Sequence, residues 1–127
     1  MPPQPYLDHV QIAAPPGCEA QARHFYGENR TPPTLPELEK PAPVEPRGGV
    51  WFALGDAQLH IGVEAQFRPA RKAHPALRID GATLDALARR LADAGAAVRW
   101  DEELPDVRRF FTDDPWGNRL ELLAPAG

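Results

Sequence analysis

The same order of predicted elements occurs twice along this chain: a strand, a helix and then a run of strands. Each element is predicted from the spacing of its apolar residues and from the Gly and Pro residues that flank it. The first copy is predicted over residues 6–12 (strand), 17–28 (helix), 35–40 (a weak edge strand), 50–54 and 58–64 (a hairpin). The second copy is predicted over residues 74–80 (strand), 82–94 (helix), 97–101, 107–112 and 119–123 (three strands). The repeated unit is therefore βαβββ.

Residues able to bind a metal occupy matching places in the two copies. His9 and His74 lie 65 positions apart, each in the first strand of its copy. His60 and Glu121 lie 61 positions apart, each in the last strand, within the frames Gln-Leu-His-Ile-Gly and Arg-Leu-Glu-Leu-Leu. Two copies are expected to form a pseudo-symmetric pair, because a solenoid needs three or more repeats.

The length of 127 residues is enough for one domain with a sizeable core. We expect a single domain over residues 1–127, made of two modules at about residues 5–64 and about residues 73–125 and joined by residues 65–72. Eleven of the sixteen prolines lie in the first 46 residues. Because proline is poorly tolerated inside helices and central strands, residues 31–47 are expected to form a loop with at most an edge strand.

Charge and composition argue against several classes of protein. The net charge of −4 disfavours a nucleic-acid-binding protein, which usually carries a basic patch. No apolar run approaches the ~18 residues of a membrane span, and the N-terminal sequence lacks the features of a signal peptide. The chain contains no serine, and its single cysteine, Cys18, has no partner for an internal disulfide. We therefore expect a cytoplasmic protein that binds neither nucleic acid nor a membrane.

Four side chains that can bind a metal stand at equivalent positions of the two modules: His9, His60, His74 and Glu121. If each module is an open curved sheet, its first and last strands lie near the middle. Two such sheets that meet would then bring the four groups to one point. Imidazole and carboxylate ligands suit zinc, iron, nickel, cobalt or manganese. The sequence thus predicts a divalent metal site.

Four phrases of the sequence carry a family resemblance: Leu7-Asp8-His9-Val10, Gln58-Leu59-His60-Ile61-Gly62, Ala73-His74-Pro75-Ala76-Leu77 and Asp114-Pro115-Trp116-Gly117-Asn118-Arg119-Leu120-Glu121-Leu122. They resemble the vicinal oxygen chelate superfamily, the group of glyoxalase I, bleomycin- and fosfomycin-resistance proteins and extradiol dioxygenases. The resemblance covers nearly the whole chain. It implies an α+β fold in which two βαβββ modules form a curved mixed sheet around a cavity, a divalent metal in that sheet, and a homodimer.

The resemblance also implies roles for single residues. His9 matches the first-strand metal ligand of the first module, His74 matches its counterpart in the second, and Glu121 matches the last-strand carboxylate. His60 stands where glyoxalase-like members usually have a metal-binding carboxylate that takes a proton, and where the dioxygenases have an acid–base histidine. It is therefore expected to be a fourth ligand or the general base. Phe111 stands where the dioxygenases tend to have a tyrosine.

The expected function is a divalent-metal-dependent, glyoxalase-like enzyme of the lyase or isomerase type, acting on a small substrate with vicinal oxygens. The metal would act as a Lewis acid on the two oxygens, and a base would move a proton at the adjacent carbon. Two alternatives stay open. One is a ligand-binding or resistance protein of the same fold without turnover. The other is an extradiol-type dioxygenase, against which Phe111 counts.

Two further features have simpler interpretations than catalysis. Residues 114–118 are interpreted as a turn that sets the register of the last two strands, in preference to a catalytic loop. Five basic residues could bind an anionic substrate, but most are interpreted as solvated loop and edge residues: Arg68, Arg71, Lys72, Arg108 and Arg109.

Overall fold

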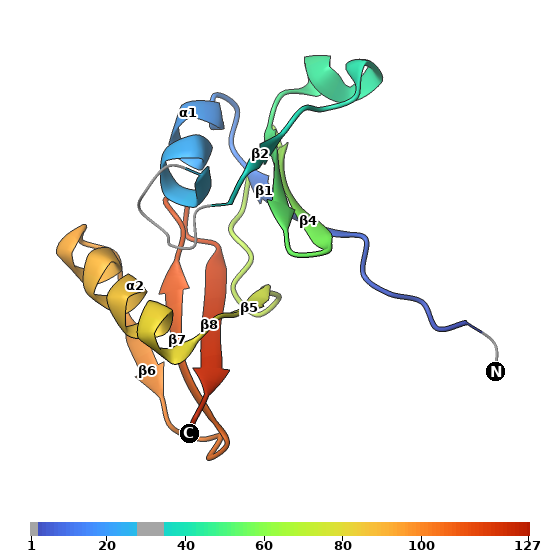
Figure 1. Ribbon diagram of the computed structural model, residues 1–127. Helices are drawn as coiled ribbons and strands as arrows, with labels where there is room; N and C mark the ends of the chain where they lie inside the picture. The colour runs from blue at the N-terminus through green and yellow to red at the C-terminus, as the bar shows by residue number, and fades with distance from the viewer. Residues whose placement is uncertain (1–2, 28–34) are drawn as a thin grey trace.

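The computed structural model describes residues 3–27 and 35–127, which form two four-stranded sheets flanked by helices. The first sheet contains β1 (His9–Ala14), β2 (Glu37–Leu38), β3 (Val50–Leu54) and β4 (Ala57–Val63). The second contains β5 (Ala76–Arg78), β6 (Arg99–Asp101), β7 (Val107–Asp113) and β8 (Arg119–Pro125). The helical elements are α1 (Glu19–Ala22), the π-helical turn η1 (Arg23–Gly27), the 3₁₀ helix η2 (Ala42–Arg47) and α2 (Gly81–Asp93) (Figure 1).

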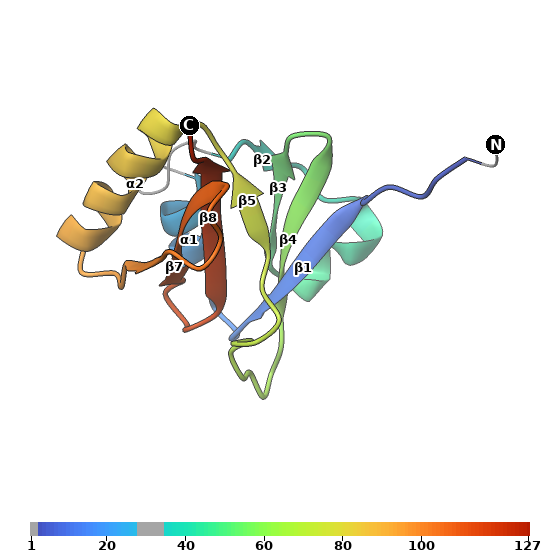
Figure 2. The same ribbon diagram turned by 90° about the horizontal axis from the view of Figure 1, so that it is seen from below.

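The two sheets share one topology. Their strand orders are β1-β4-β3-β2 and β5-β8-β7-β6. In each sheet the first strand lies at an edge and pairs in parallel with the last strand, whereas the other pairs are antiparallel. The predicted fold of two repeated units with mixed sheets is confirmed (Figure 2). Among the described residues, no helix combines the length and the apolar character that crossing a bilayer requires.

The N-terminal elements differ from the sequence prediction in their bounds. β1 begins at His9, three residues later than predicted. Its parallel partner β4 begins only at Ala57, after the Gly55–Asp56 turn, so residues 6–8 have no strand beside them with which to pair. The chain before β1 extends away from both sheets (Figure 1). The helix predicted over residues 17–28 consists of the short α1 and the turn η1, and residue 28 lies outside the described residues.

The proline-rich segment is partly helical, which corrects the prediction of a loop. The two residues of β2 are the edge strand that the sequence predicted. Residues 31–34 lie outside the described residues, but Ala42–Arg47 forms a 3₁₀ helix with Pro46 inside it. The fixed φ of proline suits this helix. The Lys40 ammonium donates hydrogen bonds of 2.8 and 3.0 Å to the carbonyls of Gly48 and Gly49, which holds the segment against the start of β3.

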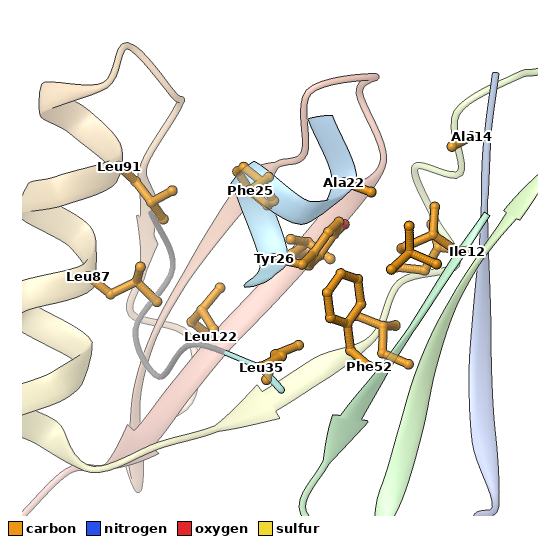
Figure 3. Packing of buried hydrophobic residues seen from close by; sticks show 14 of the residues in the cluster. Ile12, Ala14, Ala22, Phe25, Tyr26, Leu35, Phe52, Leu87, Leu91 and Leu122 are labelled. Carbon is orange, nitrogen blue, oxygen red and sulfur yellow. The ribbon is translucent and has the colours of Figure 1, made fainter. Parts of the chain in front are cut away.

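A single apolar core lies between the two sheets. Alternate residues of the longer strands point into it, among them Ile12 and Phe52 from the first sheet and Leu122 from the second. Figure 3 shows Phe25 and Tyr26 of η1 between the leucines of α2 on one side and Phe52 and Ile12 of the first sheet on the other. Each large side chain buried in this way contributes about 1.5–3 kcal/mol to folding. Since the core uses one face of each sheet, the other face is left for polar side chains.

Residues 114–118 form a turn, as the sequence predicted. The Asp114 carboxylate accepts hydrogen bonds from the backbone N–H groups of Trp116 and Asn118, and the Gly117 N–H donates to the Asp114 carbonyl. The sequence did not predict that this turn also contacts the first module and the connector. The Asn118 side chain donates to the Ala13 carbonyl in β1 and accepts from the Ala70 N–H in the connector. The turn therefore fastens the second module to the first.

Candidate functional site

The four predicted metal ligands lie outside the central core. In β1 and β4, the core-facing positions alternate with His9 and His60, so the two histidines share the opposite face. In β8, Glu121 lies between the core residues Leu120 and Leu122 and points to the opposite face of the second sheet. His74 lies just before β5, next to Glu121 in space. Each sheet thus presents one pair of predicted ligands.

Three aromatic rings stack on the first sheet. The ring of His60 lies parallel to that of Trp51, with centroids 3.8 Å apart, and also stacks on His9, with centroids 4.3 Å apart. Gly62 leaves room for the side chain of Gln11 on this sheet, because a Cβ there would lie 2.8 Å from it. His60 is buried in the stack, whereas the side chain of His9 is 45% exposed.

Hydrogen bonds fix which ring nitrogen carries a lone pair. His9 Nδ1 donates to the Asp8 carboxylate at 2.8 Å, which leaves Nε2 as the lone-pair nitrogen. His60 Nε2 donates to Gln58 Oε1 at 2.8 Å, which leaves Nδ1. Burial, with a smaller contribution from His9, lowers the pKa of His60 below its ordinary value. His60 is therefore a neutral imidazole at neutral pH and is able to bind a metal or accept a proton.

The second pair meets directly. His74 Nε2 lies 3.1 Å from Glu121 Oε1, and the other nitrogen of His74, Nδ1, donates to the Lys72 carbonyl at 2.8 Å. Because a carbonyl only accepts, Nε2 of the neutral imidazole is an acceptor, and it faces a second acceptor in the carboxylate. Two facing acceptors require a cation between them, either a proton or a metal ion. This local chemistry fits the predicted metal.

Glu121 has the cationic partner that its burial requires. Arg109 donates to Glu121 Oε2 at 3.3 Å and also to Asp101 at 3.1 Å, and its guanidinium lies 5.2 Å from the centre of the Phe111 ring. Arg109 is thus an ion-pair partner of a predicted ligand, which the sequence interpretation of a solvated side chain missed. The edge of Phe111 faces His74 at 5.5 Å, so the position of the dioxygenase tyrosine is apolar here.

The two pairs do not converge within one chain. Among residues 3–27 and 35–127, no three His, Cys, Asp or Glu side chains come together in a group that could hold a metal ion. An apolar cavity of about 310 Å³ lies between η1, α2 and the second sheet, and it is lined mainly by core residues such as Tyr26, Leu91 and Leu122. None of the four predicted ligands lines it, so this cavity is distinct from both pairs.

No protein-family model matches the chain, and no curated protein matches it. A solved structure with substantial identity does. It is a glyoxalase family protein from Bacillus anthracis, 42% identical to this chain, with a TM-score of 0.88 and a match that covers 98% of each chain.

More distant structures share the fold alone. The lactoylglutathione lyase of Agrobacterium tumefaciens is 17% identical, with a TM-score of 0.69 and coverage of 98% of this chain and 96% of that one. A fosfomycin resistance protein of Listeria monocytogenes is 14% identical, with a TM-score of 0.71 and coverage of 97% and 95%. At this identity only the arrangement of the elements can be compared.

Proposed function

Because this chain belongs to the glyoxalase family, within the vicinal oxygen chelate superfamily, we propose that it is a divalent-metal-dependent enzyme of the lyase or isomerase type. Its substrate is a small molecule with two vicinal oxygens. The family includes enzymes of different chemistry, so the proposal depends on the side chains of this chain itself.

The observation that carries the proposal is the 3.1 Å approach of His74 Nε2 to Glu121 Oε1, with the other ring nitrogen of His74 engaged by the Lys72 carbonyl. With His9 they make two imidazoles and one carboxylate, a ligand set that suits zinc, nickel, iron, cobalt or manganese and leaves positions for a substrate. The hydrogen bonds of His9 to Asp8 and of His74 to the Lys72 carbonyl support this role, because metal-binding histidines usually donate their other N–H to such groups.

Each complete site is proposed to need two chains. His9 and His60 lie on one sheet and His74 and Glu121 on the other, on faces that both point away from the shared core. In a homodimer, the first sheet of one chain could face the second sheet of its partner. This arrangement would form two equivalent sites, each with one pair of ligands from either chain. Tyr6 and Leu7, which are 89% and 60% exposed on the extended N-terminal segment, are apolar surface that a partner chain would cover.

His60 is proposed as the base. Its ring lies almost parallel to that of His9, 15° apart in plane, so a single ion cannot lie in both ring planes while the stack persists. A bound metal would supply Lewis-acid polarisation of the two substrate oxygens. His60, neutral and with Nδ1 carrying the lone pair, would accept a proton from the adjacent carbon. The stack between Trp51 and His9 would hold its ring in position.

Metal titration tests the proposal. Protein stripped with a chelator is titrated with zinc, nickel and manganese, and anaerobically with iron(II). We expect about one ion per chain for at least one metal. His74→Ala should lose at least about tenfold in affinity, while His24→Ala, a matched histidine outside the ligand pairs, should not.

The metal titration can also contradict the proposal. A wild-type protein that takes up none of the four metals would exclude the enzyme proposed here and would favour a ligand-binding protein of the same fold. For His60, the expected result is retained metal in His60→Gln with loss of turnover. Loss of metal from that variant would instead make His60 a ligand.

A further inference from the structure

Two arginines flank one aromatic ring beside the predicted metal ligands, and only one of them is paired. The guanidinium carbons of Arg109 and Arg119 lie 5.2 and 5.6 Å from the centre of the Phe111 ring. Arg109 is held by Asp101 and Glu121. Within the described part of the chain, no hydrogen bond or ion pair reaches the guanidinium of Arg119, and its Nε is buried without a partner.

The carboxylate opposite Arg119 in the sheet already has a partner. Asp113 lies directly across from Arg119 in the β7–β8 ladder. Its two oxygens accept hydrogen bonds of 3.0 and 3.1 Å from Arg99, on the neighbouring strand β6. A buried N–H group without a partner lowers stability, and such groups are rare in folded proteins unless a ligand or water satisfies them. The described residues therefore provide no hydrogen-bond or ion-pair partner for the Arg119 guanidinium.

Arg119 also lies in the right place to contact a substrate. It precedes Glu121 by two residues in β8, so the two side chains share one face of the sheet. The Phe111 ring contacts both Arg119 and His74, which links the guanidinium to the His74–Glu121 pair. An anion bound to Arg119 would be a close neighbour of a metal bound at that pair.

We propose that Arg119 binds an oxyanion of the substrate, a carboxylate or a phosphate-type group, and so selects anionic molecules with vicinal oxygens. A guanidinium offers two parallel N–H donors to such a group, and the guanidinium of Arg119 lies over the Phe111 ring. The substrate class rests on the proposed function, but the anion site itself does not.

The test measures anion binding and metal binding separately. Inorganic phosphate and acetate are titrated calorimetrically into metal-free protein, and zinc is titrated in a second series. Arg119→Gln is compared with Arg108→Gln. Arg108 is a matched control, because it pairs with Asp85 and lies on the face of β7 opposite to Phe111. We expect Arg119→Gln to raise the Kd of the preferred anion at least about tenfold, with zinc stoichiometry and dimer mass unchanged. Arg108→Gln should bind the anion like the wild type.

The outcomes separate this proposal from the previous one. Equal anion affinity in Arg119→Gln and the wild type, or no anion binding by the wild type, would overturn the anion site whatever the zinc result. If the wild type binds the anion but no metal, and Arg119→Gln loses the anion, the anion site is supported and the proposed metal-dependent enzyme is contradicted. Dissociation of the Arg119→Gln dimer would show that Arg119 pairs with the partner chain instead. If Arg119→Gln does not fold, Arg119→Lys keeps the charge without the two parallel donors and should still weaken anion binding.

Discussion

The Tyr26 hydroxyl donates a 2.8 Å hydrogen bond to the Asp114 carboxylate, across 88 positions of the sequence. Tyr26 belongs to η1 of the first module, and Asp114 begins the turn before β8 of the second. Burial raises the pKa of Asp114, and the donors around it, from Tyr26, Trp116 and Asn118, oppose that rise. The buried Asp114 carboxylate thus accepts hydrogen bonds from both modules.

Tyr26→Phe should destabilise the protein by about 1.5–3 kcal/mol, because it removes a hydrogen bond to a buried charged group without changing the shape of the ring. Urea denaturation at fixed protein concentration measures this change. Tyr6→Phe, at a side chain that is 89% exposed, should have no measurable effect. Equal stability of the Tyr26→Phe variant and the wild type would mean that the contact contributes little to joining the modules.

Glu121→Gln should lower metal affinity by at least about tenfold while the protein stays folded. The amide keeps the size of the carboxylate but removes the negative charge beside His74 Nε2 that would bind the metal. Competition with a chromogenic chelator measures the affinity, and circular dichroism checks the fold. Glu64→Gln, at an exposed carboxylate beyond β4, is the matched control. Full metal stoichiometry with unchanged affinity in Glu121→Gln would remove Glu121 from the site.

His60 should make metal-free protein less stable in mildly acidic solution. Because its pKa is lowered in the folded state, the unfolded chain binds the proton more readily. The free energy of unfolding should therefore fall as pH drops below about 6.5, the ordinary value for histidine, and rise again with pH. His60→Gln should flatten this part of the profile, and His24→Gln should not. An identical slope in wild type and His60→Gln would contradict the burial of a neutral imidazole.

Glu19 should contribute to stability at neutral pH and lose that contribution in acid. Its carboxylate accepts a 2.7 Å hydrogen bond from the Gly49 N–H, which is the main cause of its lowered pKa. The stabilisation is complete above the ordinary value of 4.5 and is lost as pH falls through the lowered value. Glu19→Gln should be less stable than wild type near pH 7 and equal to it at low pH, as measured by thermal unfolding. A stability difference that does not change with pH would contradict this.

Local patterns predicted most of the fold. The apolar spacing of α2 and the glycine that follows it placed the helix at residues 82–94, against the observed Gly81–Asp93, and Gly95 adopts the positive φ of 86° that ends a helix. The matching positions of His9 and His74 indicated two repeated units, and the two sheets have the same topology. The start of β1 could not be predicted, because it depends on where its parallel partner β4 begins, about fifty positions further along the chain.

The sequence predicted which residues form the candidate site, and this stays a prediction; it did not predict that they lie as two separate pairs. His9 and His60 lie in β1 and β4, the first and last strands of the first module, as the sequence predicted. The ligands lie in two pairs because the two modules pack around a common core. The spacing of residues along the sequence does not show how the modules pack. The unpaired guanidinium of Arg119 was likewise missed, since its isolation depends on Arg99 engaging Asp113 across two strands.

A mixed dimer tests the central claim most directly, since that claim is that His9 of one chain and the His74–Glu121 pair of another bind one metal. His9→Ala and His74→Ala chains carrying different affinity tags are co-expressed, the mixed dimer is isolated, and its metal content is measured. We expect both parent homodimers to bind no metal tightly and the mixed dimer to bind one ion, because one of its two sites regains every ligand. A mixed dimer as empty as its parents, beside a wild-type dimer with two ions, would contradict a site shared between chains.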